Sequence, residues 1–304
     1  SRPGTMVSTW LNGLVSGTVS TGAGYSAGGY VDGVGEVTTV DKFLFPSDAR
    51  STLGTGLAAA TRYMAAMANS GTAGYWGGGD EDDAVDVVYK FAFSDDGRTT
   101  LSATLGDLTN QTAGMANSGT AGYTCGGWTN SAALTTVNKI AFSNDAITQL
   151  GTGLSTALRL LGAMANSGTA GYAGGGLAGP VTTIDKFAFS DDGRTTLGTG
   201  LSAATFGNTG MANSGTAGYF GGGSSNLTTV DKFAFSDDGR TTLGTGLSTG
   251  RNYTAGFADS GVAGYFAGGS AASGYVDTVD KFAFADDSRT TLSTGLSAAT
   301  FGCS

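Results

Sequence analysis

Residues 210–247 read GMANSGTAGYFGGGSSNLTTVDKFAFSDDGRTTLGTGL, and variants of this stretch recur along most of the chain. The tight-turn sequences NSGT and DDGR separate short apolar and β-branched runs, which predicts strands at 210–213, 217–222, 230–235 and 241–247. Neither face of the third strand is wholly polar, which indicates that neighbouring copies cover both faces. The stretch therefore predicts a four-stranded antiparallel meander packed between two others.

Each copy carries a Tyr within an AGY tripeptide, followed by paired Gly. These are Tyr25, Tyr75, Tyr123, Tyr172, Tyr219 and Tyr265, which mark units one to six and lie 50, 48, 49, 47 and 46 residues apart. That period suits one propeller blade and is too short for a separate domain. We therefore expect an N-terminal arm at 1–14 and one all-β domain at 15–304. This domain would be a six-bladed β-propeller with four antiparallel strands per blade, closed between the last blade's fourth strand and the first blade's first strand.

Composition argues against several function classes. The chain has 15 Lys and Arg against 24 Asp and Glu, a formal net charge of −9, so we expect no nucleic-acid partner. It contains no apolar run of the ~18 residues that a membrane helix needs, so we expect no membrane insertion. Because there is no His, Ser-His-Asp, Cys-His and His-metal chemistry are excluded, and we expect neither a cofactor nor a metal site.

Two repeated charged motifs receive structural interpretations. All six Lys fall at one repeat position, which cannot supply a unique catalytic base, so we expect each stem to lie between blades and each ammonium to pair with an Asp or a carbonyl. The DDGR sequences are expected hairpin turns, with cation binding as the alternative. The two Cys, Cys125 and Cys303, lie about a third of the expected ring apart, so we expect no disulfide between them.

The paired Gly and the following V-x-K-F-x-F strand resemble the Kelch repeat of β-propellers. The Gly pairs are Gly28-Gly29, Gly78-Gly79, Gly126-Gly127, Gly175-Gly176, Gly222-Gly223 and Gly268-Gly269. The family's Arg before the first strand has counterparts at Arg62, Arg159 and Arg251, but Asn110 and Phe206 replace it elsewhere, and Leu replaces the family's fourth-strand Trp. Near-identical copies of VDKFAFSDDGRTTLGTGLS look like the Kelch-like repeats of tail-fibre and virion proteins of marine bacteriophages.

The two ends of such a meander differ in how much the copies vary. We call the end with the NSGT and DDGR turns the uniform face, and the end with the variable loops after the Gly pairs the divergent face. Loops on a rigid scaffold commonly carry recognition, although neutral drift would also make them diverge. The expected ligand-binding residues on the divergent face are Tyr30, Arg62, Tyr63, Asp80, Glu81, Trp128, Arg159, Arg251, Tyr253 and Tyr275. The acidic loop Asp80–Asp83 has no matching cations in sequence, which favours neutral or cation-bridged glycans.

These observations together predict a non-enzymatic recognition or adhesion module. We expect a phage tail-fibre or virion protein, located on the virion or outside the cell. Its partners would be a host-surface glycan or protein and other virion proteins. A purely structural virion or cell-surface component is the alternative. A glycan-cleaving enzyme is a further one, for which Glu36 and Glu81 are the only Glu residues.

Overall fold

The computed structural model describes residues 22–304, which form strands, turns and loops and no helix. No segment of this range could therefore cross a membrane as a helix. The expected arm at 1–14 and the expected first strand of unit one lie outside the described residues.

The strands form antiparallel sheets, and in the main sheet of each unit the strand order follows the sequence. Unit one contributes β1 (Ala23–Ala27), β4 (Val40–Leu44) and β5 (Ala49–Thr52). The next five units each contribute a sheet of four: β6 (Ala65–Asn69), β7 (Ala73–Gly77), β8 (Val88–Ala92) and β9 (Arg98–Thr100); β10 (Ala113–Asn117), β11 (Ala121–Cys125), β12 (Val137–Ala141) and β13 (Ile147–Gln149); β14 (Gly162–Asn166), β15 (Ala170–Gly174), β16 (Ile184–Ala188) and β17 (Arg194–Thr196); β18 (Thr209–Asn213), β19 (Ala217–Gly221), β20 (Val230–Ala234) and β21 (Arg240–Thr242); β23 (Ala255–Asp259), β24 (Ala263–Ala267), β27 (Val279–Ala283) and β28 (Arg289–Thr291).

The meander predicted for unit five is confirmed, except that its fourth strand is shorter than expected. The strand β21 ends at Thr242, and Leu243 makes one more backbone bond to Val230. The chain then turns inward and buries Leu247, which is 3% exposed. Burial of an apolar side chain therefore ends the strand before the residues that the β pattern included.

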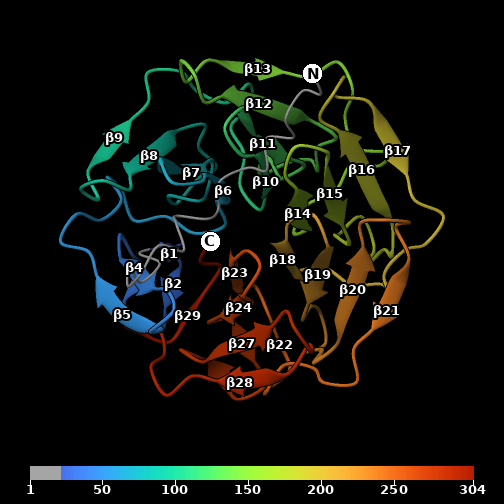
Figure 1. The fold of residues 1–304 in the computed structure, drawn as a ribbon. Helices are drawn as coiled ribbons and strands as arrows, with labels where there is room; N and C mark the ends of the chain where they lie inside the picture. Colours follow the sequence, from blue (N-terminus) through green and yellow to red (C-terminus); the bar gives the residue numbers. More distant parts are fainter. Residues whose placement is uncertain (1–21) are drawn as a thin grey trace, which may run out of the picture.

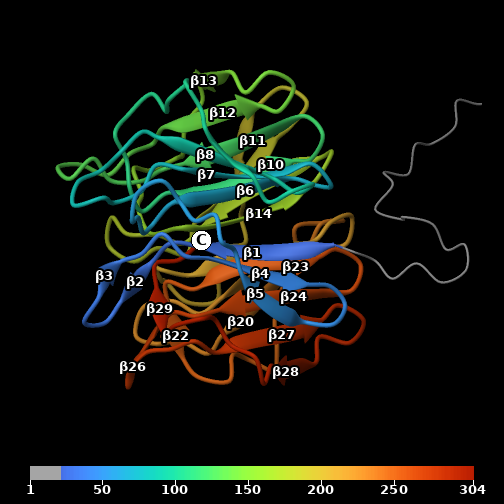
Figure 2. The same ribbon diagram turned by 90° about the vertical axis from the view of Figure 1, so that its left-hand side faces the viewer.

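The sheets are arranged around a common centre, with β1, β6, β10, β14, β18 and β23 inside and β5, β9, β13, β17, β21 and β28 outside (Figure 1). This all-β arrangement is propeller-like. Two small sheets, each of three short strands, lie together on one side of the molecule, which is the divergent face (Figure 2). They are β29 (Thr300–Phe301), β2 (Tyr30–Val31) and β3 (Gly35–Glu36), and β22 (Arg251–Asn252), β25 (Ser270–Ala271) and β26 (Gly274–Tyr275).

A repeated group of three side chains joins each sheet to its neighbour, and we call it the clamp. In unit four, the Tyr172 hydroxyl donates to Asp238 of unit five at 2.8 Å, and the Lys186 ammonium lies 2.7 Å from the same carboxylate. The expected pairing of all six Lys with Asp is thus confirmed. The other clamps are Tyr25–Lys42–Asp96, Tyr75–Lys90–Asp145, Tyr123–Lys139–Asp192, Tyr219–Lys232–Asp287 and Tyr265–Lys281–Asp48. The last of these joins unit six to unit one.

The uniform face contains further hydrogen bonds between successive NSGT turns. The Asn166 side chain accepts from the Gly215 N–H at 2.8 Å, while the Ser167 N–H donates to the Ser214 hydroxyl at 3.0 Å. The same two bonds recur between units two and three, three and four, and five and six. The likeness of these turns therefore has a structural cause.

The paired Gly are required by backbone geometry, as unit five illustrates. Gly222 and Gly223 have φ values of 70° and 130°. A Cβ on Gly222 would meet the Arg251 carbonyl oxygen, and one on Gly223 would meet the Thr205 hydroxyl. Only Gly allows the chain to turn here so close to Arg251 of the next unit and to Thr205 of its own unit.

Cys125 and Cys303 are both free and buried, which confirms that no disulfide joins them. Burial raises the pKa of the Cys125 thiol to about 12 and also raises that of Cys303. Because the thiolate is the reactive form, we expect neither to react with a thiol-specific reagent at pH 8 in the folded protein, and both to react in denaturant. Rapid labelling without denaturant would contradict this placement.

Candidate functional site

The divergent face converges on a ring of six backbone hydrogen bonds. Each ring residue donates its N–H to the carbonyl of the ring residue one unit back, over 2.7 to 3.0 Å, and the Tyr63–Gly302 bond closes the ring. Its members are Tyr63, Gln111, Leu160, Gly207, Tyr253 and Gly302. Their φ values, 56° to 67°, are left-handed and unusual for bulky side chains. The ring thus holds four non-Gly side chains at fixed points around the centre.

A cavity of about 110 Å³ adjoins the ring and is lined by ring residues and the inner strands. Its lining residues include Gln111, Thr112 and Thr254 but no charged side chain. None of the side chains that line the cavity therefore carries a carboxylate or an ammonium group. Over residues 22–304, no three His, Cys, Asp or Glu side chains converge in a way that could hold a metal ion.

Five aromatic side chains gather beside the ring, and we call them the aromatic cluster. They are Tyr30, Tyr63, Tyr253, Tyr275 and Phe301. The Tyr63 and Tyr253 ring centroids lie 5.6 Å apart, and Phe301 lies 4.4 Å from Tyr275 and 5.5 Å from Tyr30. Burial raises the pKa values of Tyr63 and Tyr253, so both keep neutral hydroxyls. All four expected Tyr thus belong to one aromatic surface.

Two ring glycines make room for this cluster. A Cβ on Gly302 would lie 2.9 Å from the Tyr63 ring, and one on Gly207 would lie 2.7 Å from the Tyr253 ring. Each Tyr ring therefore lies over the Gly of the preceding unit. The sequence prediction missed Phe301, although it precedes ring residue Gly302 as Arg62 precedes Tyr63, which is a signal that could have identified it.

Arg62 joins the aromatic cluster to carboxylates. Its guanidinium carbon lies 5.3 to 5.8 Å from the centroids of Tyr30, Tyr63 and Phe301. Its nitrogens lie 3.0 Å from Asp80 and 3.3 Å from Glu36. Burial opposes the charge, but the hydrogen bond and charge of Asp80 outweigh it and raise the pKa of Arg62. Arg62 therefore orients the rings and neutralises part of the acidic loop.

The expectation of an unmatched acidic loop at Asp80–Asp83 is accordingly wrong for Asp80 but not for the rest of the loop, because Glu81, Asp82 and Asp83 form no ion pair within residues 22–304. Asp80 pairs with Arg62, and Asp83 accepts a hydrogen bond from Asn130. Glu81 accepts from the Thr61 hydroxyl and from the Tyr89 hydroxyl, each at 3.0 Å. Burial and this carboxylate raise the pKa of Tyr89 to about 12. Glu81 therefore binds neighbouring side chains of its own unit.

Trp128 and Arg159 form a second partly exposed pair on this face. The Arg159 guanidinium lies 4.1 Å from the indole centroid, a close cation–π stack. One guanidinium nitrogen lies 3.4 Å from Gln111 Oε1 of the ring. The structure therefore brings these two expected residues together with Gln111, which the sequence prediction missed.

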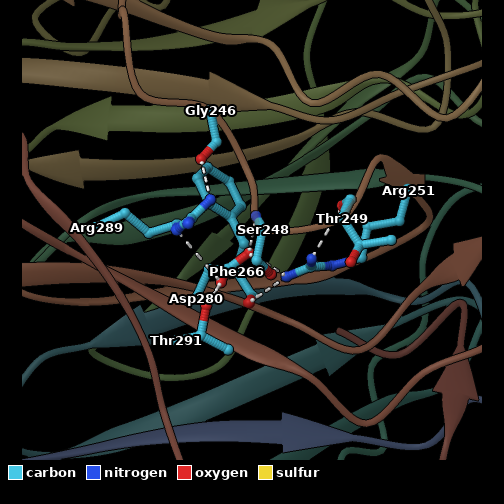
Figure 3. A network of polar contacts seen from close by, with 8 residues as sticks. All are labelled: Gly246, Ser248, Thr249, Arg251, Phe266, Asp280, Arg289 and Thr291. Atoms are coloured by element: carbon cyan, nitrogen blue, oxygen red, sulfur yellow. Dashed lines mark hydrogen bonds and ion pairs between the residues drawn. The ribbon is translucent and has the colours of Figure 1, made fainter.

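Arg251 does not belong to the surface, so its expected role in ligand contact is wrong. Its side chain is 0% exposed and lies 3.0 Å from the equally buried Asp280. It also donates to the carbonyls of Thr249 and Phe266 at 3.1 and 3.2 Å (Figure 3). Arg251 lies two residues before ring residue Tyr253, whereas Arg62 and Arg159 lie one residue before theirs. In extended chain, one residue reverses the side-chain direction.

Comparison with known proteins bears on the fold. The chain is similar to a solved structure described as "Structure of YjhT", with 13% sequence identity and a TM-score of 0.68, over 88% of this chain and 97% of that one. No family model matches the chain, and no curated protein matches it significantly. At this identity the likeness concerns the fold alone: the chain shares an all-β, propeller-like architecture over most of its length.

Proposed function

We propose that the chain is a six-bladed, closed, Kelch-type β-propeller whose divergent face is a recognition surface. Six clamps, one at each junction between units, and the six-membered ring of hydrogen bonds support the blade number. Support for closure comes from Ser304, which exchanges backbone hydrogen bonds of 2.7 and 3.2 Å with Ala27. In unit five, the first residue of the first strand, Thr209, pairs in the same way with Gly221, which corresponds to Ala27 of unit one. Ser304 therefore occupies the position at which the first strand of unit one would begin.

The observation that carries the recognition proposal is the aromatic cluster with Arg62 and the adjoining Trp128–Arg159 stack. Flat aromatic faces, hydroxyls and guanidinium groups suit sugar rings or polar protein surfaces. The uniform face uses its side chains for bonds between units instead. A host-surface glycan or protein is therefore the proposed ligand, and the proposed activity is binding without catalysis.

The proposed setting is a phage tail fibre or another virion protein, outside the cell, in contact with other virion proteins. This setting rests on the resemblance of the VDKFAFSDDGRTTLGTGLS repeats to those of marine phage virion proteins. Shallow contacts bury little area and bind weakly one at a time. Several copies on one fibre would supply the avidity that attachment needs.

Changes on the divergent face are expected to weaken attachment without unfolding the protein. We expect Trp128→Ala or Tyr253→Ala to reduce binding to host cells or to a glycan array by roughly tenfold each, a loss of about 1.4 kcal/mol. Both side chains are only partly buried, so circular dichroism should match that of the parent.

The matched control lies on the uniform face. The Arg240 side chain donates to the Gly200 carbonyl at 2.7 Å, and Arg240→Ala is expected to leave attachment unchanged. Attachment that survives every divergent-face change and fails with Arg240→Ala would reverse the assignment of faces. Binding to no surface component would favour a structural role.

A further inference from the structure

Two Arg–aromatic stacks occupy equivalent places on the divergent face. Tyr30 directly follows the Gly pair of unit one, and Trp128 directly follows that of unit three. The Arg62 guanidinium lies 5.4 Å from the Tyr30 centroid, and that of Arg159 lies 4.1 Å from the Trp128 centroid. Each Arg immediately precedes a ring residue. The protein thus builds the same stack twice.

The two stacks differ in their acidic partners. At the first, Glu36 pairs with Tyr30 across the small sheet and Asp80 bridges to Arg62, so both carboxylates reach the guanidinium. At the second, Ala133 bridges to Trp128 and Leu177 bridges to Arg159. Apolar side chains therefore occupy both positions from which carboxylates bind Arg62.

Several N–H donors of the Arg159 guanidinium are consequently available to a ligand. Within residues 22–304 it forms no ion pair, and its polar side-chain partner is Gln111 Oε1 at the long distance of 3.4 Å. A guanidinium carries five N–H donors in a planar fork. Stacking on Trp128 fixes the plane of that fork and leaves its edge for a partner.

We propose that Arg159 binds a carboxylate of an acidic sugar, which takes the place that Glu36 and Asp80 fill beside Arg62. A carboxylate matches the guanidinium fork with two parallel hydrogen bonds. Tyr253 offers aromatic surface against which a sugar ring can pack, and it lies near enough that Arg159 partly opposes the rise in its pKa. This inference rests on the proposed function and narrows its ligand from a host-surface glycan or protein to a carboxylated glycan, in place of the neutral or cation-bridged glycan that the sequence favoured.

The test titrates the full chain with trigalacturonate and with its neutral methyl ester, and follows tryptophan fluorescence. Of the three Trp of the chain, Trp10 lies outside the described residues, Trp76 is 3% exposed and Trp128 is partly exposed, so comparison with Trp128→Phe identifies the Trp128 signal. We expect the acid to bind at least tenfold more tightly than the ester. Arg159→Gln should remove that preference, and Arg159→Lys should retain part of it because charge remains without the fork.

A transplanted carboxylate provides a second, independent variant. Leu177→Asp places an acidic side chain where Asp80 stands beside Arg62, so it should occupy Arg159 and weaken trigalacturonate binding at least tenfold. Arg240→Gln on the uniform face is the control and should leave binding unchanged.

The proposal fails if the ester binds as tightly as the acid, if Leu177→Asp keeps full affinity, or if neither sugar binds. If a polyglutamate peptide bound as tightly as trigalacturonate, the ligand of Arg159 would be an acidic protein instead of an acidic sugar. Failure of the proposed function looks different, because host attachment would then be insensitive to every change on the divergent face.

Discussion

Asp280→Ala is expected to lower the free energy of unfolding by about 3–5 kcal/mol, the usual loss when one partner of a buried ion pair is removed. Asp280 and Arg251 are both 0% exposed and lie 3.0 Å apart. The variant would leave the Arg251 charge in the interior with only carbonyl partners. Urea unfolding, followed by circular dichroism, measures the loss.

Unit five supplies the matched control for this prediction. Asp231 accepts from Ser202 at 2.7 and 2.8 Å and from Thr242 at 2.6 Å, as Asp280 does from Ser248 and Thr291. Thr205, however, stands where unit six has Arg251, two residues before its ring residue. Asp231→Ala should therefore cost only about 1–3 kcal/mol, the cost of unsatisfied polar groups. Equal losses in both variants would show that the Arg251 pair adds nothing.

Local patterns predicted the strands but not the side-chain environments. Turn sequences and strand periodicity identified the meander of unit five, since both depend on neighbouring residues. The sixfold Lys position was assigned correctly because repetition itself argues against a unique catalytic role. Arg251 was misplaced because a shift of one residue changes the face of an extended chain, and sequence spacing alone did not resolve that shift.

The aromatic cluster shows a second reason why the sequence did not predict the side-chain environments. Tyr30, Tyr253 and Phe301 come from three distant segments, and ring and small-sheet pairing bring them together. Pairings of this kind depend on how whole units pack against one another, and local sequence patterns do not reveal that packing. Residue type nevertheless identified most members, because aromatic residues in variable loops are unusual unless they pack or bind.

The contrast between the two faces has a structural reading. Bonds between NSGT turns and the clamps constrain the uniform face, so the likeness of its copies follows from stability. The loop sequences of the divergent face vary because these bonds do not constrain them, so their variation is not in itself evidence of recognition. The case for recognition therefore depends on what the divergent loops assemble: a closed ring, an aromatic cluster, and two Arg stacks of which one lacks a carboxylate.

Alkaline pH is expected to destabilise the protein through all six clamps together. Burial and the Asp acceptor raise the pKa of each clamp Tyr above 10, to about 12 for Tyr172. The pKa values of Lys90 and Lys186 are raised as well, because the Asp and Tyr partners outweigh burial.

Above pH 10 the unfolded chain loses these protons before the folded one does, so stability that is complete below pH 10 declines as the pH rises through the folded-state pKa values. The Lys and Asp side chains of the clamps are 18–29% exposed, so solvent screens their charges. We therefore expect about 0.5–1 kcal/mol per clamp, or about 3–6 kcal/mol in all, to be lost between about pH 10 and 12. Urea unfolding across this range measures the decline, and Tyr172→Phe should reduce it by one clamp's share. A free energy of unfolding that stays constant to pH 12 would contradict the clamp's role.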